Sequence, residues 1–133
     1  MNIITFGTFD LLHIGHIRIL ERAKNYNNNP NNRLIVGIST DEFSYQKKNK
    51  FPIYDQYQRK KILESLKFID KVFFEESFEK KKQYIIENNA DVFIMGSDWK
   101  GKFDNLNDIC KVAYFERTPS ISTTEIIDVI KKY

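Results

Sequence analysis

The chain of 133 residues has the length of one ordinary domain, and at that size roughly two-thirds of the unfolded chain's surface can be buried. Hydrophobic residues make up 41% of the sequence and charged residues 29%, a balance that is typical of a globular protein and too apolar for a disordered one. The net charge of +3 is small for a dedicated nucleic-acid-binding protein, so we expect no nucleic-acid partner. Anionic small molecules fit this charge better.

The cysteine content and the apolar runs indicate the cellular location of the protein. The single cysteine, Cys110, excludes an internal disulfide and a cysteine-based zinc site. No apolar run approaches the roughly 20 residues of a membrane helix, and the N-terminus lacks the pattern of a signal peptide. We therefore expect a cytoplasmic location without membrane insertion.

Hydrophobic periodicity predicts alternating strands and helices along the chain. In chain order these are a strand at 3–6, a helix at 14–24, an Asn-rich surface loop at 25–32, a strand at 34–38, a helix at 54–66, a strand at 72–74, a helix at 78–87, strands at 92–95 and 112–115, and a helix at 125–131. Such alternation indicates an α/β fold, which we expect to be a single Rossmann-like domain over residues 1–133. Its sheet would be five-stranded, mostly parallel and flanked by helices.

Ligands of an open parallel sheet bind beyond the carboxyl ends of its strands. Four segments of this chain follow predicted strands and are rich in His, Asp, Lys, Arg, Ser and Thr: residues 7–16, 39–50, 96–104 and 117–124. The functional site is therefore expected where these four segments meet.

Both histidines of the protein lie in the first of these segments, GTFDLLHIGH at residues 7–16. The start of a helix attracts phosphate through its unpaired N–H groups and its partial positive charge. Gly15 leaves room for a ligand to approach the backbone, and His13 and His16 could stabilise charge that grows on phosphate oxygens. A structural alternative is that His13 packs and His16 only caps the helix. The five glycines form neither a Walker A loop nor a dinucleotide fingerprint.

Several motifs spread over nearly the whole chain carry a family resemblance. They are GTFDLLHxGH at 7–16, ILERAK at 19–24, ISTDEF at 38–43, DVFxMGxDWxGKFD at 91–104 and RTxxISTT at 117–124. In these motifs the chain resembles the glycerol-3-phosphate cytidylyltransferase family, within the nucleotidyltransferase superfamily whose signature is H-x-G-H. The resemblance implies transfer of CMP from CTP to a polyol phosphate, with glycerol 3-phosphate as the expected acceptor, giving CDP-glycerol and pyrophosphate. It also implies Mg²⁺ as cofactor with CTP and a homodimer.

The same resemblance assigns roles to matching positions. Catalytic roles fall on His13, His16, Lys48 and Arg117. Nucleotide binding falls on Gly7, Thr8, Phe9, Gly15, Asp98, Arg117, Ile121, Ser122 and Thr123. Acceptor binding falls on Lys47, Lys50, Arg59, Lys67 and Trp99, and Asp10 is the expected aid to Mg²⁺.

Several of these residues also have a purely structural interpretation. Asp10 could order its turn through the backbone, Ser122 could cap the last helix, and Trp99 could be a core aromatic. The basic stretch 47–61 could be a solvated face, and its lysine register against the family is open because the loop is one residue longer.

The chain departs from the family pattern at three positions. Ser120 stands where glycine is usual, Ser97 where an acidic residue is common, and Lys67 where arginine is usual. An ammonium group cannot reproduce the planar fork of a guanidinium, so a lysine at position 67 would hold an acceptor phosphate differently from an arginine.

Two other functions compete with this interpretation. One is an adenylyltransferase of the same superfamily acting on another small phosphate acceptor. The other is a non-catalytic module that binds a phosphate ligand or RNA through residues 47–61. The sequence leaves open the exact acceptor, the pathway, the kinetic order and the oligomeric state.

Overall fold

The computed structural model describes residues 1–117 and 122–133, and its centre is a five-stranded sheet in the order β3-β2-β1-β4-β5. The strands are β1 (Asn2–Gly7), β2 (Arg33–Ser39), β3 (Lys71–Glu75), β4 (Val92–Gly96) and β5 (Lys111–Phe115). Every expected strand is present. All the strand pairs are parallel, so the sheet is wholly parallel rather than mostly so.

Five α-helices lie among the described residues, with three short 3-10 turns. The helices are α1 (Ile14–Lys24), α2 (Asp41–Lys48), α3 (Gln56–Glu64), α4 (Lys81–Glu87) and α5 (Thr123–Lys132). The turns are η1 (Tyr26–Asn28), η2 (Ser97–Trp99) and η3 (Asp104–Asp108). Four of the helices confirm the predicted ones, and η1 lies within the predicted Asn-rich loop.

Helix α2 contradicts the prediction of a loop for the segment that carries Lys47 and Lys48. Thr40 caps this helix by accepting a hydrogen bond from the Phe43 N–H at 3.1 Å, and Asn49 ends it with a φ of 58°. The helix shows little apolar periodicity, because Phe43 and Ser44 are its buried residues. Its capping residues, rather than a hydrophobic stripe, mark its bounds.

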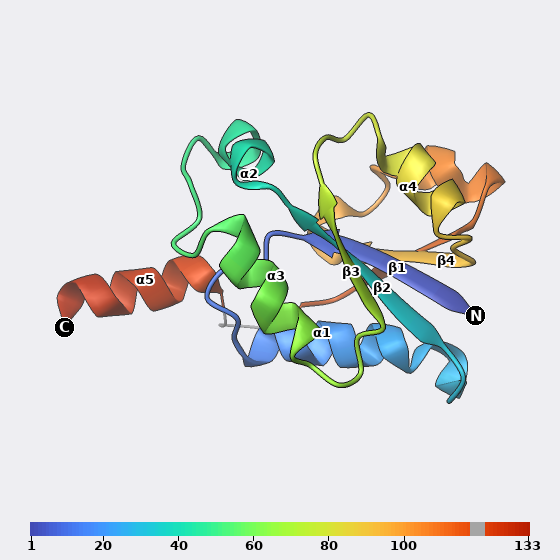
Figure 1. Ribbon diagram of the computed structural model, residues 1–133, viewed down its shortest axis with the longest axis horizontal. Coiled ribbons are helices and arrows are strands. Elements are labelled where there is room, and N and C mark those ends of the chain that lie inside the picture. The colour runs from blue at the N-terminus through green and yellow to red at the C-terminus, as the bar shows by residue number, and fades with distance from the viewer. Residues whose placement is uncertain (118–121) are drawn as a thin grey trace.

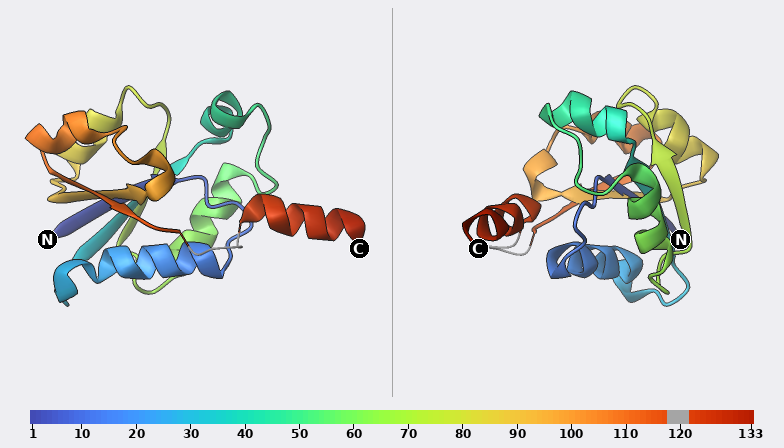
Figure 2. Two further views of the ribbon diagram at one scale, coloured as in Figure 1. Left: turned by 180° about the vertical axis from the view of Figure 1, so that it is seen from behind. Right: turned by 60° about the vertical axis from the view of Figure 1, so that its left-hand side comes forward.

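The sheet is covered on both faces, as a parallel sheet requires. Adjacent residues Ile3 and Ile4 of β1 are both fully buried and belong to different hydrophobic clusters, one on each face. Leu20 and Leu63 bring α1 and α3 onto the first face, and Ile85 brings α4 onto the second. Figure 1 shows the resulting three layers, and Figure 2 shows α5 extending away from them.

Strand β1 is the point at which the chain changes direction across the sheet. The chain runs outward from β1 to β2 and β3, and then crosses back to β4 and β5 on the other side of β1. A crevice opens at such a switch point, beyond the carboxyl ends of the two flanking strands. Here that crevice lies beyond Gly7, Ser39 and Gly96, the last residues of β1, β2 and β4.

The described part of the chain has no helix with the length and apolar character needed to cross a membrane.

Candidate active site

The turn between β1 and α1 is tight and strained. A Cβ at Gly7 would lie 2.8 Å from the far end of the Phe9 ring, so a larger residue where the turn begins would force that ring to shift. Phe9 and Leu11 adopt left-handed backbone conformations with φ values of 52° and 49°. Each such conformation costs a non-glycine residue about 1–2 kcal/mol. Strain of this kind persists when the surrounding contacts determine the backbone path, and it is common at functional sites.

Both histidines cap helix α1, and they do so reciprocally. His13 is the N-cap residue, and its Nδ1 accepts the Gly15 N–H at 3.1 Å. Three residues later, Nδ1 of His16 accepts the backbone N–H of His13 at 3.2 Å. This is a capping box built from two imidazoles in place of the usual Ser or Thr and Glu. The capping alternative and the functional interpretation of the pair are therefore compatible.

These hydrogen bonds determine the tautomer of each ring. A nitrogen that accepts an N–H carries no proton, so a neutral His13 or His16 holds its proton on Nε2. Burial lowers the pKa of His13, and burial together with the nearby His13 and Lys48 lowers the pKa of His16 to about 3. Both side chains are thus neutral Nε2–H donors at neutral pH, and both line the cavity described next.

A cavity of about 680 Å³, here called the main cavity, opens beyond the carboxyl end of β1. It brings together residues from all four predicted segments. The predicted site residues that line it are Gly7, Thr8, Phe9, Asp10, His13, Gly15, His16, Lys48, Lys50, Asp98, Trp99, Arg117, Ser122 and Thr123. Sequence reasoning missed three apolar lining residues on the loop before α3, Phe51, Pro52 and Ile53.

The far wall of the main cavity is formed by the start of α5 and by an exposed ion pair. Ser122 caps α5 by accepting the Glu125 N–H at 3.1 Å, and the Thr123 hydroxyl donates to the Asp10 carbonyl oxygen at 2.8 Å. Nη1 of Arg117 lies 3.5 Å from Oδ2 of Asp98, and more than half of each side chain is exposed. A helix start and an arginine with little burial together form a site suited to phosphate groups.

A second cavity of about 460 Å³, here called the lysine cavity, adjoins the main one. It contains a buried ion pair, with Nζ of Lys81 2.7 Å from Oε2 of Glu75. Nζ of Lys81 also lies 4.1 Å from the ring centroid of Phe6, and Nζ of Lys47 donates to the Ser39 hydroxyl at 2.8 Å. The two cavities share a boundary of six residues, Phe6, Gly7, Thr8, Lys48, Asp98 and Trp99.

Burial shapes the protonation of the groups in the lysine cavity. It lowers the pKa of Lys47 to about 8, and it lowers the pKa of Lys81 while raising that of Glu75. The close Lys81–Glu75 contact opposes both of the latter shifts, so the pair is held as a charged pair. Four lysines line this cavity, Lys47, Lys48, Lys81 and Lys102, against the two carboxylates of Glu75 and Asp98, so positive charge is in excess.

Lys81 and Glu75 form a buried charged pair in the site that the sequence analysis also missed. Lys81 stands in a run of three lysines, and such a run is usually solvated. One signal could have identified it, because Lys81 precedes the buried Tyr84 and Ile85 by three and four residues and so shares their face of the helix. Glu75 has no comparable signal.

Two predicted positions, Arg59 and Lys67, do not line the cavities as expected. Arg59 lines neither cavity and is 1% exposed, and its guanidinium is bonded to protein groups. Lys67 is exposed between α3 and the start of β3, at the edge of the sheet opposite the carboxyl ends. Ile121 lies outside the described residues.

The oxygen atoms near Asp10 that could act as metal ligands do not form a Mg²⁺ site built by the protein alone. Oδ1 of Asp10 accepts the N–H groups of Leu11 and Tyr54, and Oδ2 accepts the N–H of Ile53. Asp98 is the other carboxylate lining the described part of the main cavity, and it pairs with Arg117. Within residues 1–117 and 122–133, no group of three His, Cys, Asp or Glu side chains could hold a metal ion.

Comparison with known proteins decides the family. A model of the cytidylyltransferase-like family matches residues 4–129 of the chain. The chain belongs to the cytidylyltransferase-like family. This confirms the family predicted from the sequence motifs.

Two bacterial relatives of this cytidylyltransferase-like chain are similar over nearly their full length. A glycerol-3-phosphate cytidylyltransferase of Bacillus subtilis (strain 168) is 54% identical over 129 residues, covering 96% of this chain and 95% of the relative. A glycerol-3-phosphate cytidylyltransferase of Staphylococcus aureus (strain NCTC 8325 / PS 47) is 48% identical, covering 93% and 90%. Among solved structures, the lipopolysaccharide core biosynthesis protein of Thermoplasma volcanium GSS1 matches with a TM-score of 0.73 and 24% identity, covering 89% of this chain and 98% of that one. That likeness supports the Rossmann-like fold.

Proposed function

We propose that this protein transfers CMP from CTP to glycerol 3-phosphate, forming CDP-glycerol and pyrophosphate. The names and near-complete overlap of its 54% and 48% identical relatives support this reaction. The observation in the structure that carries the proposal is the meeting of two cation-bearing cavities at Thr8 and Lys48, beside two imidazole donors. One cavity suits a nucleoside triphosphate, and the other suits a small phosphate.

The main cavity is the proposed CTP site. Its volume of about 680 Å³ lies within the usual range for small-molecule sites. The Nε2–H groups of His13 and His16 would donate to phosphate oxygens, as would the start of α5. Arg117 can exchange its exposed Asp98 partner for a phosphate at small cost, because exposed ion pairs contribute only about 0–1 kcal/mol.

The lysine cavity is the proposed acceptor site. Lys47 was predicted to bind the acceptor, and Lys81 joins it there. The four lysines and two carboxylates that line it leave a net positive charge that suits a phosphate monoester. The cavity opens onto the main cavity at Thr8 and Lys48, so an acceptor phosphate held there would face the nucleotide phosphates.

The reaction needs no nucleophile from the protein. An oxygen of the acceptor phosphate attacks the α-phosphorus of CTP, a new P–O bond forms, and the bond to the β-phosphate oxygen breaks. Pyrophosphate leaves with that bond's electron pair. The protein contributes by aligning the two phosphates and by donating hydrogen bonds to oxygens that gain charge, and such donors are each worth about 10²- to 10³-fold in rate. His13, His16 and Lys48 are the groups at the boundary that can do this.

Magnesium enters this proposal as part of the substrate. The carboxylates around Asp10 do not make a resident site, so we expect Mg²⁺ to arrive bound to the CTP phosphates. A turnover assay across Mg²⁺ concentrations at fixed CTP tests whether Mg²⁺ arrives with the nucleotide: activity should follow the concentration of the Mg·CTP complex.

The cytoplasmic location and the lack of a nucleic-acid partner stay predictions.

A homodimer is also proposed. Helix α5 exposes Val129 and Ile130, with 60% and 62% of their surface accessible, and a second copy of the chain would cover such a surface. Sedimentation velocity tests this directly. A species of twice the chain mass is expected, and a monomer at all concentrations would contradict it.

The acceptor site is tested by removing its buried ion pair as a unit. A single Lys81→Gln change would leave Glu75 buried without its partner, which costs about 3–5 kcal/mol of stability. The double variant Glu75→Gln/Lys81→Gln avoids this and should raise the KM for glycerol 3-phosphate while leaving the KM for CTP unchanged. Lys82→Gln, an exposed neighbour on α4, is the matched control. A rise confined to the CTP KM would reverse the assignment of the two cavities.

A further inference from the structure

Three of the lysines that line the two cavities belong to one segment that leaves the sheet after β2 and returns at α3. We call residues 41–55 the α2 segment; it comprises α2 and the loop that follows. Lys48 and Lys50 of this segment line the main cavity, and Lys47 lines the lysine cavity. The positions of all three cations therefore depend on how the α2 segment is held against the sheet.

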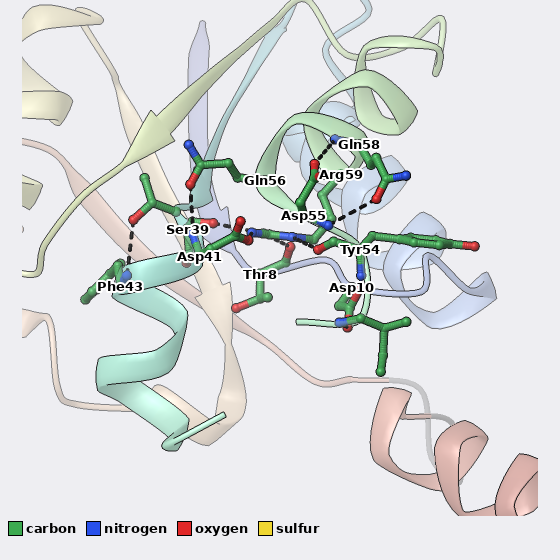
Figure 3. Close-up of polar contacts among 12 residues, drawn as sticks. Thr8, Asp10, Ser39, Asp41, Phe43, Tyr54, Asp55, Gln56, Gln58 and Arg59 are labelled. Atoms are coloured by element: carbon green, nitrogen blue, oxygen red, sulfur yellow. Dashed lines mark hydrogen bonds and ion pairs between the residues drawn. The ribbon is translucent and has the colours of Figure 1, made fainter. Parts of the chain in front are cut away.

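Arg59 holds both ends of the α2 segment. Its side chain is fully buried, and its Nη2 donates to Oδ1 of Asp41, where α2 begins, at 2.7 Å. Its Nε donates at 2.9 Å to the carbonyl oxygen of Tyr54, near the end of the segment. Figure 3 shows the guanidinium lying between these two partners.

The same guanidinium joins the segment to the ends of two strands. Nη1 of Arg59 donates to the carbonyl oxygens of Thr8 and Ser39, both at 2.8 Å. Four of its five N–H groups are thus used within the protein. Thr8 belongs to the boundary between the cavities, so Arg59 joins the lysine-bearing segment to the residue at which the two proposed substrates meet.

Asp10 makes a second attachment at the far end of the segment. Its Oδ2 accepts the Ile53 N–H at 2.6 Å, and its Oδ1 accepts the Tyr54 N–H at 2.9 Å. Asp10 stands between Phe9 and Leu11, the two residues with left-handed backbones, and it is buried. Its carboxylate therefore joins the strained phosphate turn to the cavity wall formed by the α2 segment.

We propose that Arg59 and Asp10 are positioning residues that fix the α2 segment against the turn after β1, and that neither contacts the substrates. The sequence assigned them to the acceptor and to Mg²⁺, but their hydrogen-bonding groups are directed at backbone atoms from three separate elements. Their effect on catalysis would pass through Lys47, Lys48 and Thr8. The kinetic part of this inference rests on the proposed function, whereas the structural part does not.

Amide hydrogen exchange measured residue by residue by NMR tests the structural part without any turnover. In Arg59→Lys, which keeps the charge but loses the planar fork, the Ile53 and Tyr54 amides should exchange at least about tenfold faster. Exchange in the buried strand β2 should stay as in the wild type. Lys61→Met, at an exposed cation of the same helix, is the control and should leave all of these rates unchanged. Unchanged exchange in Arg59→Lys, or equally faster exchange in β2, would overturn the proposal.

Kinetics then separate positioning from binding. A shift of about 1 Å in the reacting groups can cost about 10²-fold, so Arg59→Lys and Arg59→Gln should both lower kcat by about that factor. Neither should raise the KM for glycerol 3-phosphate selectively. If Arg59 contacted the acceptor phosphate, the lysine variant would retain part of the binding that the glutamine variant loses. A selective rise in acceptor KM with rescue by lysine would overturn the positioning role.

Asp10→Asn provides a second, nearly isosteric variant. The amide cannot accept both the Ile53 and the Tyr54 N–H groups in the same geometry, so those amides should again exchange faster. The Mg²⁺ concentration that gives half-maximal rate should stay unchanged. Unchanged exchange at residues 53 and 54 together with a higher Mg²⁺ requirement would make Asp10 a metal ligand and overturn its positioning role.

Discussion

The imidazole rings of His13 and His16 stack with their centroids 3.7 Å apart and their planes 21° from parallel. Two imidazolium ions at that distance would repel each other, so the stack favours neutral rings. Because both Nδ1 atoms accept backbone N–H groups, the two rings act as a pair of Nε2–H donors. The capping of α1 and the proposed contact with phosphate use opposite sides of the same rings.

Substitution at His13 can separate these two uses. In His13→Asn the amide oxygen can still cap α1, whereas the Nε2–H donor is lost. We expect kcat to fall by about 10²- to 10³-fold with a nearly unchanged melting temperature. His13→Ala should lose the same activity and also about 1 kcal/mol of stability, measured by urea unfolding. Wild-type turnover in the Asn variant would contradict the catalytic role.

His16 makes stability depend on pH in a defined window. Its pKa falls from 6.5 to about 3 on folding, so between these values the unfolded chain binds more protons and stability drops as the pH is lowered. The expected loss from this group is about 2 kcal/mol between pH 7 and pH 5. Urea unfolding at both pH values gives the change in the free energy of unfolding between pH 7 and pH 5 for wild type and for His16→Asn. The difference between these two changes measures the contribution of His16. Equal changes in the two proteins would mean that His16 titrates normally.

Lys47 should limit acceptor binding at high pH. Burial lowers its pKa to about 8, so its ammonium group is charged below that pH and loses its proton as the pH rises through it. The KM for glycerol 3-phosphate should therefore increase above about pH 8. In Lys47→Arg the side chain stays charged and the KM should stay level over the same range. The same increase in both proteins would assign the titration to another group.

Arg117→Lys should impair the use of CTP although it preserves the charge. A guanidinium can bind two phosphate oxygens at once, and an ammonium acts as a single point charge. We expect kcat/KM for CTP to fall about tenfold, which corresponds to about 1.4 kcal/mol. Arg33→Lys, at an exposed arginine at the opposite end of the sheet, is the control. Equal kinetics in the two variants would place Arg117 outside the nucleotide site.

Hydrophobic patterning made the strands and α1 predictable. Runs such as that containing Ile35, Val36 and Ile38 are buried on both faces of a sheet, and few other structures suit them. Helix α2 was missed because it contributes mainly Phe43 to the core and is defined by caps at Thr40 and Asn49. A short polar helix gives no periodic signal.

The polar contacts of the site were less predictable for a related reason. Thr8 and Ser39, whose carbonyl oxygens Arg59 contacts, are 51 and 20 positions away from it along the chain, and no local pattern encodes such a pairing. Family motifs identified which side chains matter but not whether each one faces a ligand or the protein. The strained backbone at Phe9 and Leu11 was equally unpredictable, since large side chains rarely adopt it.

The choice of nucleotide and acceptor is the most direct test of the account. Pyrophosphate release is measured with sn-glycerol 3-phosphate and either CTP or ATP at equal concentration in excess Mg²⁺, and the organic product is identified by mass. The account predicts CDP-glycerol from CTP at a rate far above that of any product from ATP, because a pocket that pairs with cytosine leaves buried groups unpaired with adenine. CTP turnover with a different polyol phosphate alone would change the acceptor and preserve the mechanism. A clear preference for ATP would contradict the proposed cytidylyl transfer itself.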